Sequence, residues 1–190
     1  MPRAGLSPQR VVGAAGDLAD QLGYDRLTLA AVAQHFGVAV PSLYKHIAGL
    51  DQLQAEVAAE AITELGKRLA AATTGETGQG LRALAQAYRQ YAHSHPGRYA
   101  ATVRAADPSN PAAVAASEAV LSTVLSVLEG YGIKGDDAID TTRAIRSALH
   151  GFVTLEAASG FGLPRDVNRS FDRLVTMLET ALVNPVAASP

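Results

Sequence analysis

The sequence has no cysteine and no tryptophan, and aromatic residues make up only 5% of its 190 residues. Without cysteine the chain has no disulfides, no thiolate zinc sites and no thiol nucleophiles, as is typical of proteins from a reducing compartment. Long apolar runs are also missing: Asp17 and Asp20 interrupt the first residues, and no segment approaches the roughly 18 apolar residues of a membrane span. We therefore expect a cytoplasmic protein with no membrane partner.

The motifs of common enzyme and metal sites are missing as well. There is no Gly-x-Ser-x-Gly elbow, no His-Glu-x-x-His pair and no phosphate-binding glycine loop. The glycine-rich segment 130–135 follows a helical pattern and not a strand, so we interpret it as a turn. His93 and His95 are two residues apart, which places them on different sides of a helix and argues against a shared metal. We predict no catalytic residue, no metal site and no cofactor.

What the sequence does contain is alanine, leucine and helical periodicity, without alternating strand patterns, which predicts an all-helical protein of about nine helices. Ser7 and Pro8 have the form of an N-cap and first helical residue, and Gly23 ends the apolar repeat, so a first helix is expected over 8–22. Thr28 caps a second helix that ends at Gly37. A third helix is expected from about residue 40 to 47.

The remaining helices are separated by glycine-rich and proline-rich segments. The segment "TTGETGQG", residues 73–80, combines glycine with small polar residues and is the best domain boundary. We predict a three-helix N-terminal domain over 1–47, a connecting helix over 48–72 and an all-helical C-terminal domain over 80–184. Further helices are expected over about 81–95, 97–105, 114–128, 136–159 and 166–183.

The stretch "GVAVPSLYKHI" joins the second and third helices and has the pattern of a helix-turn-helix unit. Leu43 and Ile47 face inward at i, i+4 spacing, which leaves the polar residues between them facing solvent or a partner. A hydroxyl, an ammonium and an imidazole there can bind DNA phosphates or base edges. The alternative is an exposed helix whose polar residues only maintain solubility. Residues 1–50 carry a net charge of only +1, which by itself does not indicate nucleic acid.

Residues 26–53, "RLTLAAVAQHFGVAVPSLYKHIAGLDQL", resemble the DNA-binding segment of TetR-type transcriptional regulators. The positions that match in register are Thr28, Ala33, Gly37, Val38, Leu43, Tyr44, Lys45, His46 and Leu53. The resemblance implies a helix-turn-helix domain joined to an all-helical domain that dimerises and binds a small molecule. The DNA-contacting residues that it implies are Thr28, Val40, Pro41, Ser42, Tyr44, Lys45 and His46.

Within that set, the resemblance places Thr28 and Tyr44 at phosphates, Lys45 and His46 at the backbone or groove, and the other three nearest the bases. Many relatives have a lysine at the position of Leu50, so we expect DNA affinity to depend more on Arg3 and Arg10.

A second resemblance covers "ALHGFVTLEAASGFG", residues 148–162, and the following "FDRLVTML". It is to the regulatory domain of the TetR branch named for a Trp-His-Gly signature. His150 and Gly151 match this signature, whereas Leu149 replaces the tryptophan.

The helix expected over 136–159 has a stripe of small residues, which lets two helix backbones approach closely. In a regulator of a two-fold operator, this stripe and the last helix would pack against the same elements of a second chain. The alternative is a contact within one chain. The predicted dimer interface comprises Ala144, Ser147, Gly151, Thr154, Ala158, Phe171, Leu174, Val175 and Leu178.

Aromatic residues from separate C-terminal helices and from one loop predict an apolar cavity for a small molecule, with a histidine and an arginine as its polar groups. A tightly packed core is the alternative. The predicted ligand-binding residues are Tyr88, Tyr91, His95, Tyr99, Arg104, Phe152 and Phe161.

The sequence is therefore interpreted as a TetR-like regulator that acts as a homodimer. It is expected to be a repressor, released from its double-stranded DNA operator by an unknown small-molecule inducer. The alternative, supported by Leu50 and the nearly neutral N-terminal domain, is a helical small-molecule-binding protein that has lost specific DNA recognition. A helical enzyme is a third, more distant interpretation.

Overall fold

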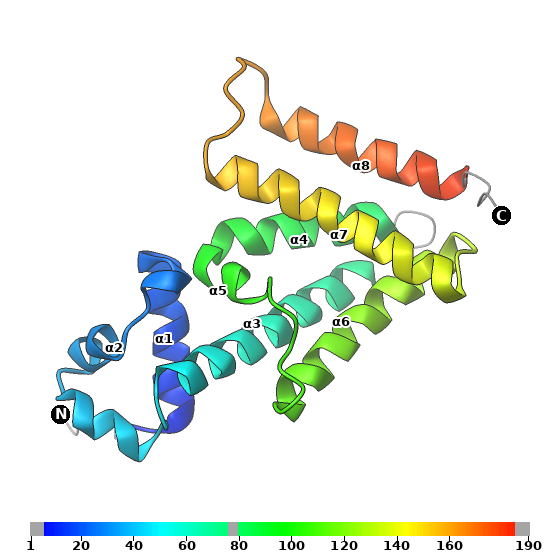
Figure 1. Cartoon of the computed structure of the whole chain (residues 1–190). Coiled ribbons are helices and arrows are strands. Elements are labelled where there is room, and N and C mark those ends of the chain that lie inside the picture. Colours follow the sequence, from blue (N-terminus) through cyan, green and yellow to red (C-terminus); the bar gives the residue numbers. More distant parts are fainter. Residues whose placement is uncertain (1–5, 76–79, 185–190) are drawn as a thin grey trace. The chain divides into compact units, whose positions relative to one another are not determined.

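The computed structural model describes residues 6–75 and 80–184, and every regular element in these two ranges is helical (Figure 1). The predicted all-helical fold class is confirmed. Residues 76–79 of the predicted domain boundary lie outside the described residues. The elements are α1 (Pro8–Leu22), η1 (Tyr24–Arg26), α2 (Leu29–Phe36), η2 (Val40–Lys45), α3 (Leu50–Thr73), α4 (Gly80–Ser94), α5 (Pro96–Ala101), α6 (Pro111–Gly130), α7 (Gly135–Ala157) and α8 (Val167–Val183), where η denotes a 3₁₀-helix.

The chain divides into two compact units. The first comprises the described part of Met1–Glu64 together with Ser94–Glu118, and the second comprises Leu65–His93 together with the described part of Ala119–Pro190. Helices α3 and α6 therefore contribute to both units. This division differs from the predicted boundaries because α5 and the first turns of α6 group with the N-terminal helices.

The core of the first unit is built from the inward faces of α1, α2, η2 and the first half of α3. Val11, Val32, Leu43 and Leu53 are fully buried in it. Local capping sets the start of α1, because the Ser7 hydroxyl accepts a hydrogen bond from the Arg10 amide at 3.3 Å. Gly23, with φ of +96°, ends the helix as predicted.

Helix α5 packs directly on the C-terminal end of α1. A Cβ atom on Gly97 would lie 2.0 Å from the carbonyl carbon and oxygen of Ala19, so only glycine fits. The next residue, Arg98, donates its backbone N–H to Asp20 Oδ1 at 2.8 Å and its guanidinium to the Asp17 and Asp20 carboxylates. This contact explains why residues 94–118 belong to the first unit.

The second unit contains the α7–α8 hairpin, whose helices lie side by side (Figure 1). The Phe152 ring of α7 contacts the Phe171 ring of α8, with 5.1 Å between the ring centroids. Arg82 of α4 forms an ion pair with Glu179 of α8 at 2.6 Å. Gly66 permits a close approach of α3 to α6, since a Cβ there would lie 3.0 Å from Val120 Cγ2.

The length and hydropathy of helix α6 contradict our expectation that no segment is apolar enough to span a membrane. In the described part of the chain it is the one helix whose length and composition would allow it to cross a bilayer, with a mean hydropathy of 1.6 and 22% of that apolar stretch buried. Alanine, valine and leucine keep this average high despite Glu118 and Glu129. Length and composition alone do not distinguish a membrane span from a bundle helix.

Candidate nucleic-acid interface and regulatory surfaces

The turn between α2 and η2 follows from two local features of the sequence. Thr28 caps α2 by accepting a hydrogen bond from the Ala31 amide to its side-chain oxygen at 3.2 Å. Gly37 adopts the left-handed conformation at φ of +64°, and the Val38 amide bonds the Ala33 carbonyl at 3.0 Å. This is the helix-ending geometry that glycine favours. The chain therefore leaves α2 sharply and enters η2.

The segment predicted as the third helix is a 3₁₀-helix, Val40–Lys45, with Pro41 in its first turn. Leu43 and Ile47 are buried, as the i, i+4 spacing predicted. Pro41, Tyr44 and Lys45 are exposed, with Tyr44 at 55%, while the Val40, Ser42 and His46 side chains are half-buried. Pro41, Tyr44 and Lys45 thus lie on the outer side of η2, whereas Val40 packs against the core of the first unit.

Residues 6–50 contain only three lysine or arginine residues, Arg10, Arg26 and Lys45. Arg10 in the first turn of α1 is exposed, whereas Arg3 lies outside the described residues. Leu50 is half-buried and packs against the core of the first unit, so its side chain is used for packing. Thr28 is exposed beyond its capping role. A DNA contact here would combine hydroxyl groups with Lys45 and Arg10 instead of a dense basic patch.

The predicted dimer interface is only partly available in the protomer. The Ala144, Ser147 and Thr154 side chains of α7 and the side chain of its C-cap, Ala158, are exposed. Gly151 is half-buried, and apart from the neighbouring backbone of α7 no atom lies within 4 Å of the position that a Cβ would take. In contrast, the Phe171 and Val175 side chains of α8 are each only 1% exposed. They pack within their own chain, because they lie on the face of α8 that meets α7. Leu174 and Leu178 are half-buried.

The residues predicted to bind a ligand are divided between the two units. Tyr88, Tyr91, Phe152 and Phe161 belong to the second unit, where Tyr91 is fully buried and the Phe152 and Phe161 ring centroids are 4.8 Å apart. His95, Tyr99 and Arg104 belong to the first unit. The His95 ring bonds Asp20 at 3.2 Å, and Tyr99 is buried. The structure therefore brings the two phenylalanines together within the second unit, whereas the other three residues belong to the first unit.

A cluster around Arg89 was not predicted from the sequence. Arg89 Nε donates to Glu156 Oε2 at 2.8 Å, and the guanidinium also donates to Asn168 Oδ1 at 3.0 Å. His93 Nε2 lies 2.7 Å from the same Glu156 oxygen. The Arg89 guanidinium stacks over the Phe171 ring, 4.7 Å from its centroid. These contacts tie α4, α7 and α8 together across 67 to 82 residues of sequence, a separation that no local pattern could reveal.

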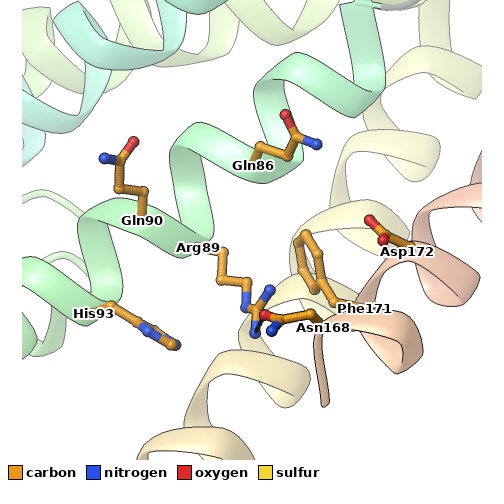
Figure 2. A pocket seen from close by; sticks show the side chains of 7 residues that line it. All are labelled: Gln86, Arg89, Gln90, His93, Asn168, Phe171 and Asp172. Atoms are coloured by element: carbon orange, nitrogen blue, oxygen red, sulfur yellow. Dashed lines mark hydrogen bonds between the residues drawn. The ribbon is translucent and has the colours of Figure 1, made fainter. Parts of the chain in front are cut away.

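An open cavity of about 390 Å³ borders this cluster on α4 and α8. Figure 2 shows Arg89 reaching toward Asn168 and Phe171, while Gln86 and Gln90 leave α4 in another direction. The charged groups on its wall are already engaged within the chain, because Arg89 and His93 contact Glu156 and Asp172 pairs with Arg82. We interpret the cluster as structural.

Together, the capped α2, the glycine turn and the exposed face of η2 define a helix-turn-helix protein with a second helical unit. Comparison with known proteins agrees. Residues 81–178 match the family model described as "Tetracyclin repressor-like, C-terminal domain". The HTH-type transcriptional regulator YobS of Bacillus subtilis is 35% identical over 185 residues, which is 96% of each chain. The chain belongs to the TetR family of transcriptional regulators.

Solved structures show the same fold. A protein of unknown function from Rhodococcus sp. RHA1 aligns with a TM-score of 0.74 at 23% identity, covering 98% of this chain and 99% of that one. The TetR family protein ActR of Streptomyces coelicolor, in complex with (S)-DNPA, aligns with a TM-score of 0.67 at 18% identity, covering 95% and 98% of the two chains.

Proposed function

We propose that this chain is a homodimeric repressor that acts in the cytoplasm, binds a double-stranded DNA operator through η2 and is released by a small molecule. The observation that carries the proposal is the intact turn from Thr28 to Ile47, with Tyr44 and Lys45 exposed beside the buried Leu43 and Ile47. In helix-turn-helix proteins this second element enters the major groove. The half-buried Leu50 does not disturb the turn.

Within this proposal the residues of η2 have two kinds of role. Lys45, Tyr44 and His46 bind the phosphate backbone, together with Thr28 at the start of α2. Val40, Pro41 and Ser42 begin the element and contribute small side chains, which permits close approach to base edges.

Electrophoretic mobility shifts with DNA flanking the protein's own gene test the proposal. Lys45→Ala should weaken binding to all sequences and lower the slope of log K against log salt by about one unit, because one phosphate contact is lost. Lys67→Ala removes the same charge from an exposed position of the second unit and should leave the slope unchanged. Failure of the parent chain to bind any flanking DNA would contradict the proposal.

The base-contacting role needs a separate readout. Pro41→Ala and Ser42→Ala should change the preferred sequence more than the overall affinity, because base contacts carry specificity. Selection from a random DNA pool measures this preference. Recovery of the parent motif by both variants would remove these residues from the base-reading set.

For the homodimer, we propose that the small-residue face of α7 meets its copy in a second chain. Its support is that Ala144, Ser147, Thr154 and Ala158 are exposed in the protomer. Leu174 and Leu178 would flank this face from α8. Phe171 and Val175 support it from beneath, since they are already buried within the chain.

For the inducer, we propose an apolar or aromatic compound bound in the second unit near Tyr88, Tyr91, Phe152 and Phe161. Support comes from the aromatic clustering of Phe152 with Phe161 and from the ligand-bound structure of ActR. Phe161 is exposed enough to be changed without loss of the core, so Phe161→Ala should weaken the response to an inducer and leave ligand-free operator binding intact. An unchanged inducer response would place the ligand elsewhere.

We also propose membership of the Trp-His-Gly branch, on the match at His150 and Gly151. Leu149, in the tryptophan position, is buried and fills part of the core with a smaller side chain.

A further inference from the structure

A cavity of about 280 Å³ is lined entirely by residues of the first unit. Its walls come from η1, the first half of α3, the end of α5, the α5–α6 loop and the start of α6. The floor is apolar, with Ala58 beside the buried Ile62 and Ala101. The rim is polar and includes Tyr24, Asp51 and Arg104.

Three polar side chains of this rim, Tyr24, Asp107 and Asn110, have partners in the local structure. The Tyr24 hydroxyl donates to the Gln54 carbonyl at 3.1 Å. Asp107 accepts bonds from the Ser109 amide and hydroxyl, each at 2.8 Å, and Asn110 accepts one from the Ala113 amide at 3.1 Å. These bonds hold the α5–α6 loop against the start of α6, which gives the cavity a built wall.

Arg104 is different from these neighbours. It forms no hydrogen bond or ion pair with any residue in the ranges that the structure describes, and it lies on the cavity rim. Its charge acts on Tyr24, where it opposes the rise in the pKa of the phenol that burial causes. Arg104 is exposed, so its guanidinium donors are accessible from solvent at the cavity rim.

We propose that this cavity binds a compact monocarboxylate, whose apolar body lies on the alanine-lined floor and whose carboxylate pairs with Arg104. A guanidinium has the planar pair of donors that matches a carboxylate. The volume lies just below the roughly 300–1,000 Å³ typical of ligand pockets, which limits the body to about one ring or a short branched chain. Asp51 on the rim disfavours a second anionic group.

This site is separate from the inducer site proposed above, and it does not depend on DNA binding. It reassigns Arg104 from a polar group of the inducer cavity to the main contact of a second ligand. A ligand here would connect η1, beside the helix-turn-helix, to the α5–α6 segment. It would alter operator affinity only to the extent that it binds the DNA-bound and free forms differently.

Isothermal titration of the full chain with benzoate tests the site, with benzamide as the neutral isostere and phthalate as the dianion. Benzoate should bind saturably at one site, and more tightly than either comparison compound. Arg104→Gln should weaken benzoate binding roughly tenfold, as expected for the loss of one charge-assisted pair. Arg165→Gln, which removes an exposed arginine from the second unit, is the matched control and should bind like the parent.

A second variant locates the body of the ligand. Ala58→Leu places a larger side chain at the cavity floor and should abolish binding, with the melting temperature recorded to show that the protein is folded.

Equal binding of benzoate and benzamide, or parent-like binding by Arg104→Gln, would overturn the carboxylate assignment. Absence of saturable binding for benzoate, phenylacetate and 3-methylbutanoate would overturn the site. Loss of benzoate binding in Phe161→Ala would move it to the second unit.

Discussion

At the scale of single residues, Glu156 is a largely buried carboxylate whose negative charge is balanced by Arg89. It accepts hydrogen bonds from Arg89 and contacts His93, and the Arg89 and Glu156 side chains are only 16% and 13% exposed. Glu156→Gln keeps the shape but removes the charge that balances Arg89. We expect the free energy of unfolding at pH 7 to fall by about 1–3 kcal/mol. Urea denaturation measures this loss.

The matched control for this change is Glu129→Gln. Glu129 pairs with Lys134 at 2.8 Å, but both side chains are about two-thirds exposed. An exposed pair contributes little, so this variant should unfold at nearly the same urea concentration as the parent. If Glu156→Gln and Glu129→Gln lower the free energy of unfolding equally, burial does not make the Arg89–Glu156 pair more stabilising than an exposed pair.

The same carboxylate predicts a pH dependence with a definite sign. The hydrogen bond from Arg89 lowers the pKa of Glu156 below its ordinary 4.5, against the effect of burial, and His93 adds to the lowering. Stabilisation from a lowered pKa is present above the unfolded value and is lost as the pH falls through the folded value. The stability difference between parent and Glu156→Gln should therefore shrink from pH 7 to pH 3. If the stability difference between the two proteins is the same at pH 7 and pH 3, the lowered pKa of Glu156 is not the source of the stabilisation.

Replacing Gly97 or Gly13 of the first unit by alanine should change the stability of the protein in opposite directions. Gly97→Ala forces a Cβ into the Ala19 backbone, so we expect a loss of several kcal/mol, near the upper end of point-mutant effects. Gly13 lies within α1 with no atom within 4 Å of a Cβ position. Gly13→Ala should instead raise stability by up to about 1 kcal/mol, because alanine is the better helix former. Thermal unfolding of both variants compares the two directions.

At the scale of elements, the N-caps of α1 and α2 separate a structural role from a DNA-binding one. Ser7 and Thr28 each accept a hydrogen bond from the amide three residues later. Ser7→Ala and Thr28→Ala should both cost about 1 kcal/mol of stability. If Thr28 also binds phosphate, its variant alone should lose operator affinity, and Thr28→Ser should restore both properties. Equal affinity losses for the two alanine variants would show that capping alone matters.

The same elements show which helix bounds can be predicted from the sequence alone. The bounds of α1 and α2 were predicted correctly because Ser7, Thr28, Gly23 and Gly37 are local signals. Helix α5 ends at Ala101, about four residues earlier than predicted, where the Thr102 hydroxyl bonds the Tyr99 carbonyl. Residues 101–106 contain no proline or glycine, so the sequence gives no local signal for this end.

Long-range contacts were beyond sequence reasoning for a physical reason. Periodicity shows that Phe171 and Val175 are on an apolar face, but it does not show whether that face meets another helix of the same chain or a second copy. Phe171 and Val175 are buried in the protomer, so this face of α8 packs within its own chain. Likewise, the pairing of Arg89 with Glu156 depends on how α4 and α7 pack, which no spacing within either helix encodes.

At the scale of the whole molecule, the proposed dimer links the α7 face to operator binding. A helix-turn-helix regulator of a two-fold operator must present two recognition elements at a fixed separation, so a chain that cannot dimerise should lose specific DNA binding. The exposed small side chains of α7 fit this requirement, because they allow two helices to approach closely. The requirement makes the oligomeric state a test of the regulatory mechanism as well as of the interface.

Gly151→Leu tests that arrangement. Apart from the neighbouring backbone of α7 itself, no atom of the described chain lies within 4 Å of a Cβ on Gly151, so the single chain should accept leucine with its helices intact. In a close dimer, the added side chain meets the second copy, and overpacking costs about 1–3 kcal/mol. We expect sedimentation velocity to show a weakened dimer, circular dichroism to stay unchanged, and specific operator binding to fall. Gly130→Leu adds the same side chain at an exposed position of α6 with similar free space, and should remain dimeric. If Gly151→Leu sediments as the parent dimer and still binds the operator, the second chain must pack elsewhere.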